Sequence, residues 1–198
     1  MAPRKPSNAL GSLLVEIRAC RICEKHIQPR PIIRASSTAK ICIIAQAPGI
    51  RVHETGLSFN DPSGDRLRDW MGVDRDTFYD ESRIAIVGMG FCFPGYDASG
   101  GDRPPRRECA PAWHEKLFAV LPPFGLTLLV GSYAQARYIG TGANMTETVR
   151  NWRDHIPRVI PLPHPSWRNN SWLKKNPWFG EELLPYLRSR VRRVLASS

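Results

Sequence analysis

The side chains with the clearest capacity for chemistry are cysteines. Cys20 and Cys23 form a C-x2-C pair, and Cys92 and Cys109 follow far downstream with 16 residues between them. Four thiolates can hold structural zinc or an iron–sulfur cluster, and the spacing does not separate these two groups. A single C-x2-C is also typical of a redox pair. Cys42 lies within an apolar run and is interpreted as a buried residue.

Two further polar side chains come directly after apolar runs. Gln46 lies in the turn Ala45-Gln46-Ala47-Pro48-Gly49, and His164 begins a His-Pro-Ser segment. In an open α/β sheet, ligands bind outside the carboxyl ends of the strands. Gln46 would bring an amide to that edge, and His164 could donate a hydrogen bond to a developing negative charge. We expect Gln46, Gly88 and His164 to meet there.

Short apolar runs that contain β-branched residues indicate the elements that carry these side chains. We expect strands over residues 41–44, 84–87, 126–130 and 158–162, alternating with helices over 10–19, 64–71, 109–121, 133–139 and 181–195. Alternating strands and helices predict a parallel sheet with helices on both sides. The predicted fold class is therefore α/β, a single domain with a central four-stranded parallel sheet flanked by helices. Residues 1–9 are predicted to form a flexible arm and residues 10–198 the domain.

Composition bounds the class of protein. The chain of 198 residues carries 28 Lys and Arg against 18 Asp and Glu, a net charge of +10. This balance favours a polyanionic partner. The sequence has no apolar run of about 18 residues, which predicts no membrane-spanning helix. Cysteines without a secretory signal indicate a reducing compartment, and we expect a cytoplasmic protein.

Taken in order, the motifs resemble the uracil-DNA glycosylase superfamily, and within it the iron–sulfur branch called family 4. The resemblance covers the chain from about Arg18 to Leu187. It rests on Cys20-x2-Cys23, Gln46-Ala47-Pro48-Gly49, Gly56, Phe59, Gly64, Cys92 before Phe93-Pro94-Gly95, Cys109 before Pro111 and Trp113, and His164-Pro165-Ser166.

The resemblance implies a function, a cofactor and a partner. It implies a [4Fe-4S] cluster on Cys20, Cys23, Cys92 and Cys109, with zinc as the alternative. It also implies a DNA repair glycosylase that hydrolyses the N-glycosidic bond of uracil or another deaminated base after flipping it from the duplex. The expected partner is uracil-containing or otherwise deaminated DNA. The expected setting is a monomer at the bacterial nucleoid, without membrane attachment.

The first motif departs from the family pattern. Gln46 stands where the family has a carboxylate, and Gly88 stands where it has the asparagine that reads the base. An amide cannot act as a general base, and glycine has no side chain to contact a base edge. Asp61 and His53 are candidates to replace the lost groups. Asp61 equally suits a helix N-cap or turn position.

The remaining candidates would hold the substrate. Phe59 would stack on the base, Ala47 and its neighbouring backbone amides would position water or sugar, and Ser166 would bind a phosphate. In the superfamily the segment after His-Pro-Ser enters the DNA helix, which makes Trp167 or Arg168 the expected wedge. Further expected DNA contacts are Asn169, Arg103, Arg106, Arg107, Lys174 and Lys175.

Two other functions remain open at the level of sequence. A DNA damage-binding module with the same fold and cluster is favoured by the missing carboxylate and by Gly88. A hydrolase or transferase that uses His164 on a small nucleotide is the other. The turn at Gln46 lacks a glycine-rich phosphate cradle, and the basic charge favours a polymer, so both observations count against a small nucleotide.

Overall fold

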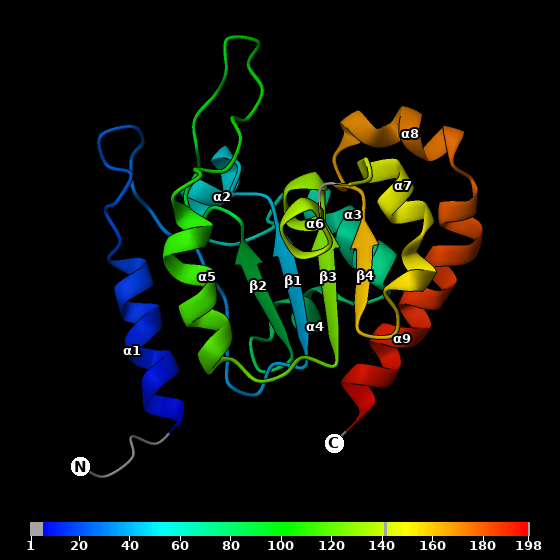
Figure 1. The fold of residues 1–198 in the computed structure, drawn as a ribbon, viewed down its shortest axis with the longest axis horizontal. Coiled ribbons are helices and arrows are strands. Elements are labelled where there is room, and N and C mark those ends of the chain that lie inside the picture. The colour runs from blue at the N-terminus through cyan, green and yellow to red at the C-terminus, as the bar shows by residue number, and fades with distance from the viewer. Residues whose placement is uncertain (1–5, 141, 198) are drawn as a thin grey trace.

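The computed structural model describes residues 6–140 and 142–197, which form a central parallel sheet between two layers of helices (Figure 1). The strands are β1 (Ile41–Ala45), β2 (Ile84–Gly88), β3 (Leu126–Val130) and β4 (Val159–Leu162), in the order β2-β1-β3-β4. Ile41 pairs with Ile84 on one side and Leu126 on the other. The predicted fold class is confirmed, because continuous apolar runs suit strands that are buried on both faces.

One face of the sheet is covered by α1 (Pro6–Arg18), α5 (Cys109–Val120) and α6 (Ser132–Tyr138). Cys42 is fully buried in this layer, as interpreted from the sequence. Helix α1 begins at Pro6 and not near Leu10, because proline is favoured in the first turn of a helix. Of the predicted arm, residues 1–5 lie outside the described part of the chain.

The opposite face is covered by α3 (Pro62–Met71), α4 (Arg75–Tyr79) and the closing helix α9 (Leu184–Ala196). The sequence predicts one closing helix over residues 181–195. The structure instead has a π-helical turn over Phe179–Leu183 before α9. Pro185 in the first turn of α9 has no amide hydrogen to donate to the preceding turn, which accounts for the change in helical pitch.

Several short elements were not predicted from the sequence, and most of them lie near the carboxyl ends of the strands. They are α2 (Ile50–Thr55), α7 (Met145–Arg150), a 3-10 turn over Trp152–Asp154, a second over Trp167–Asn169, and α8 (Asn170–Lys175). In Figure 1, α2, α8 and the long green loop between β2 and α5 lie beyond the strand arrowheads, while α7 runs alongside β4 and leads back to its amino end. No described helix is long and apolar enough to cross a membrane.

Candidate active site and cysteine pocket

A cleft of about 620 Å³ opens at the carboxyl edge of the sheet. It is lined by residues from the ends of β1, β2 and β4 and from the segments that follow them. The structure brings together there most of the predicted catalytic and substrate-binding residues, namely Gln46, Ala47, Phe59, Asp61, Gly88, His164 and Ser166. The right-handed crossovers of a parallel sheet account for this meeting of distant residues.

Gly88 lies at the floor of the cleft, where the backbone leaves no room for a side chain. A Cβ on Gly88 would stand 2.3 Å from the Gly90 carbonyl oxygen. The Gly90 amide is itself bound to the Gln46 carbonyl at 3.0 Å, which ties the turn after β2 to the turn after β1. The backbone path therefore excludes any side chain at residue 88.

A buried histidine contacts the backbone of Gly88. His114 Nε2 donates to the Gly88 carbonyl at 2.9 Å, and Tyr138 donates its hydroxyl hydrogen to Nδ1 at 2.7 Å. Burial lowers the pKa of His114 below its ordinary value of 6.5, which favours the neutral ring that this pattern requires. Burial also raises the pKa of Tyr138 to about 12, so that its hydroxyl keeps its hydrogen.

Phe59 enters the cleft in a strained backbone conformation with φ of 56°. Its carbonyl accepts hydrogen bonds from Tyr79 Oη at 3.1 Å and from Arg68 at 3.4 Å. Gly64 packs so closely that a Cβ there would lie 1.7 Å from the same carbonyl oxygen. A left-handed conformation outside glycine costs about 1–3 kcal/mol and is concentrated at functional sites. The surrounding contacts therefore hold Phe59 in one orientation.

His164 is partly buried and lies two residues past the end of β4. Its ring rests on Gly131, where a Cβ would be 3.7 Å from the His164 ring carbon Cδ2. Asn169 Nδ2 donates to the His164 carbonyl at 2.7 Å, so Asn169 holds the histidine backbone. Burial lowers the pKa of His164, and the negative charge of Asp61 acts in the opposite direction. The imidazole is therefore neutral near pH 7 and has one N–H to donate.

Asp61 has the capping role that its sequence context suggested. Its Oδ1 accepts a hydrogen bond from the Gly64 amide at 2.8 Å and begins α3. The residue still lines the cleft, and its charge acts on His164. One oxygen of Asp61 is thus committed to the helix terminus, while the carboxylate as a whole contributes negative charge to the site.

The segment after His164 forms the rim of the cleft. Trp167 is 71% exposed, and the Arg168 guanidinium lies 5.9 Å from the centre of its indole ring. The Ser166 hydroxyl accepts from the Arg168 amide at 3.2 Å, which caps the short 3-10 turn. Arg66 donates to the Ser166 carbonyl at 3.0 Å. A large exposed aromatic at a cleft rim suits contact with a ligand.

Several predicted residues lie away from the cleft. His53, one of the candidates to replace the lost groups, is on helix α2 outside the cleft lining, and its ring centre lies 6.0 Å from that of Phe93. Arg106 pairs with Glu108 at 2.6 Å beside the cysteines. Arg107 and Lys174 are exposed outside the cleft lining.

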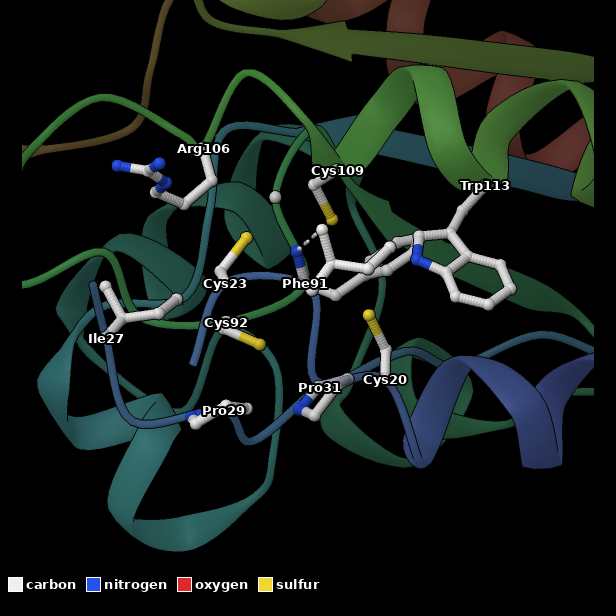
Figure 2. Close-up of a pocket in the computed structure, with 12 residues that line it drawn as sticks. Cys20, Cys23, Ile27, Pro29, Pro31, Phe91, Cys92, Arg106, Cys109 and Trp113 are labelled. Atoms are coloured by element: carbon white, nitrogen blue, oxygen red, sulfur yellow. Dashed lines mark hydrogen bonds between the residues drawn. The ribbon is translucent and has the colours of Figure 1, made fainter. Parts of the chain in front are cut away.

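The four predicted ligand cysteines line one small pocket, although they come from separate parts of the chain (Figure 2). The figure shows the four sulfur atoms directed toward a shared space, with Phe91 and Trp113 beside it. The Phe91 amide donates to Cys109 Sγ at 3.4 Å. Within residues 6–140 and 142–197, no three His, Cys, Asp or Glu side chains gather closely enough to bind a single metal ion.

Without a bound group, burial and the neighbouring charges disfavour the ionised form of the pocket cysteines. Burial raises the pKa of Cys109 to about 12 and also raises the pKa of Cys92. Burial raises the pKa of Cys23 too, against a hydrogen bond from Arg106 that lowers it. The negative charges of the neighbouring thiolates add to each of these increases. A cationic centre bound among the four sulfur atoms would offset that repulsion.

A doubly covered parallel sheet with an open cleft at its carboxyl edge defines an α/β protein that binds its ligand at the strand ends. Comparison with models of known protein families shows to which family the chain belongs. The chain belongs to the uracil DNA glycosylase superfamily, whose family model matches residues 34–188. Membership supports glycosylase-type chemistry on DNA, and all the residues that line the cleft except Ile32 lie within the matched region.

Sequence reasoning missed the residues that position the site. Arg66, Arg68 and Tyr79 act on backbone carbonyls, and nothing in local sequence pattern indicates such contacts. It also missed Asp102, which lies in the long loop before α5 and lines the cleft. The loop is polar, but its path over the sheet edge depends on tertiary structure.

Proposed function

We propose that this protein hydrolyses the N-glycosidic bond of uracil, or of another deaminated base, in DNA. The observation that carries the proposal is the meeting of Phe59 and His164 in one cleft of a uracil DNA glycosylase superfamily member. Phe59 offers an aromatic face whose orientation is held by its backbone contacts. His164 offers a hydrogen-bond donor at the end of β4.

The base enters the cleft when its nucleotide is flipped out of the DNA duplex. Extruding a nucleotide costs a few kcal/mol, which stacking and edge hydrogen bonds must offset. Phe59 supplies the stacking surface, and aromatic stacking on a base is worth about 1–3 kcal/mol. Because Gly88 has no side chain, the base edge is contacted by backbone groups of the turn after β2. This favours tolerance among deaminated bases over strict selection of uracil.

His164 stabilises the base as it departs. Cleavage of the C1′–N bond leaves negative charge on the base, and the neutral imidazole donates its N–H to that charge. A preorganised donor of this kind is worth about 2.7–4 kcal/mol in a site that excludes water. Asp61 places a negative charge near both the imidazole and the sugar, where positive charge develops in the transition state.

We also propose that Cys20, Cys23, Cys92 and Cys109 hold a [4Fe-4S] cluster. Their shared pocket, the repulsion among their thiolates and the family resemblance support this assignment. When bound, the cluster would join the segment after α1 to the start of α5 and to the loop after β2. That loop continues into the cleft, so the cluster would act structurally on the site.

The direct test is incubation of the purified protein with labelled duplexes that contain uracil, hypoxanthine or xanthine. We expect release of at least one of these bases, and a His164→Ala variant should lose about a hundredfold to a thousandfold in single-turnover rate. His155→Ala is the matched control, since His155 precedes β4 at the opposite end of the strand. Equal rates for the two variants would refute the role of His164.

A damage-binding module is the second candidate, and Gly88 is the observation that favours it. On this alternative the protein binds uracil-containing or abasic duplex more tightly than intact duplex, yet releases no base. Binding measured by fluorescence anisotropy on the same duplexes separates the two functions. Tight, damage-selective binding without base release would establish the module and refute the glycosylase.

A further inference from the structure

Asp102 reaches the cleft from the long loop between β2 and α5. An antiparallel bridge pairs Tyr96 with Asp102, and the Arg103 amide donates to the Gly95 carbonyl at 2.9 Å. These contacts fold the loop back toward the turn after β1. Asp102 Oδ2 lies 3.4 Å from the position that a Cβ on Gly49 would occupy. A carboxylate oxygen therefore stands against the turn that carries Gln46.

The hydrogen-bonding state of Asp102 differs from that of nearby carboxylates. Asp61 Oδ1 is committed to the Gly64 amide, and Asp97 Oδ1 accepts from the Ser99 amide, the Ser99 hydroxyl and the Gly101 amide. Among the hydrogen bonds of residues 6–140 and 142–197, none involves the Asp102 side chain. Both of its oxygens are thus available to a water or substrate in the cleft.

The charges around Asp102 suit a base. Asp102 is exposed to solvent at the cleft, and the neighbouring residues desolvate it only in part; this raises its pKa above the ordinary value of 3.8, and the positive charge of Arg168 opposes the rise. The negative charges of Asp61 and Asp97 raise it further. A carboxylate whose pKa moves toward the working pH accepts a proton more effectively.

We propose that Asp102 is the carboxylate that activates the attacking water, in place of the carboxylate that Gln46 has replaced. This inference rests on the proposed glycosylase function. As the C1′–N bond breaks, its electron pair leaves with the base, whose charge His164 stabilises. The water oxygen forms a bond to C1′, and its proton passes to Asp102. Asp102 then releases that proton to solvent, and the departed base takes up one proton from solvent.

Gln46 and Asp61 have complementary roles in this scheme. The Gln46 amide can bind and orient the water, but it cannot accept the proton. Asp61 is held by the helix terminus and acts through its charge on His164 and the sugar. The function of the lost carboxylate is therefore divided between an amide at the original position and a carboxylate supplied by the loop over Gly49.

The test is the single-turnover excision rate of Asp102→Asn with the best duplex substrate. Loss of a general base commonly costs about 10²–10⁴-fold, and we expect a loss in that range. Affinity for the abasic product duplex should be retained, because Asn keeps the shape and removes a charge that repels phosphate. Asp76→Asn is the matched control, since Asp76 is exposed on α4 away from the cleft.

The pH profile separates proton transfer from positioning. The wild-type rate should fall at low pH as Asp102 becomes protonated, and Asp102→Asn should lack this limb. Asp102→Glu should keep the limb and recover much of the rate. A rate for Asp102→Asn equal to that of Asp76→Asn, or an unchanged acid limb, would overturn the inference alone. Absence of base release by the wild-type protein would overturn both this inference and the proposed function.

Discussion

The close approach of Gly64 to Phe59 allows a sharp test of how the cleft is built. Replacing a helix glycine with alanine normally stabilises a protein by about 0.5–1 kcal/mol. Gly64→Ala should do the opposite, because its Cβ would lie 1.7 Å from the Phe59 carbonyl oxygen. That atom is backbone and cannot rotate away. The Phe59 peptide would have to move, together with the ring that faces the cleft.

The magnitude follows from the contacts that such a movement would break. The Phe59 carbonyl would lose hydrogen bonds from Tyr79 at 3.1 Å and from Arg68 at 3.4 Å. Each is worth about 1 kcal/mol, and overpacking adds about 1–3 kcal/mol. We expect Gly64→Ala to destabilise the fold by about 3 kcal/mol and to lower the Tm by about 6–12 °C in a chain of this size.

Urea and thermal unfolding measure the stability, and single-turnover excision measures the effect on Phe59. Gly11→Ala is the matched control, since a Cβ on Gly11 in α1 meets nothing within 4 Å. Tyr79→Phe should cost about 1 kcal/mol in the wild type and close to nothing in Gly64→Ala, where its bond is already broken. If Gly64→Ala is as stable as Gly11→Ala, the strained conformation of Phe59 is not enforced by this contact.

Three further predictions concern the cofactor, pH and DNA. Cys20→Ala should remove the brown colour and about four irons per chain, while Cys42→Ala keeps both; colourless protein with one zinc would refute the cluster. Because burial holds the pKa of His114 below its ordinary 6.5, its contribution to stability is present above that pH and is lost as the pH falls toward the lower folded-state pKa. His114→Gln should therefore flatten the decline in urea midpoint between about pH 7.5 and about pH 5, and an unchanged decline would contradict this. Trp167→Ala should reduce excision without changing the salt dependence of duplex binding, whereas Arg103→Ala should reduce the log–log slope by about 0.9; equal slope changes would make Trp167 no more than a surface contact.

Local sequence pattern determined the framework of this protein. Apolar β-branched runs predicted the strands of the sheet to within one residue at each end, because strands buried on both faces must be continuously apolar. The parallel order then required the polar residues that follow β1, β2 and β4 to meet at one edge. For this reason the sequence alone predicts that Gln46 and His164 share a cleft.

Only the tertiary structure determines the conformation of Phe59 and which further side chains reach the cleft. The left-handed conformation of Phe59 depends on Arg68 and Tyr79, whose role is contact with a backbone carbonyl and leaves no trace in residue spacing. Asp102 reaches Gly49 through the path of a long loop, and Arg106 turns toward the cysteines although its sequence context suggests DNA. Packing between distant segments sets these positions. A small difference in the path of a loop changes which residues lie next to a charged side chain.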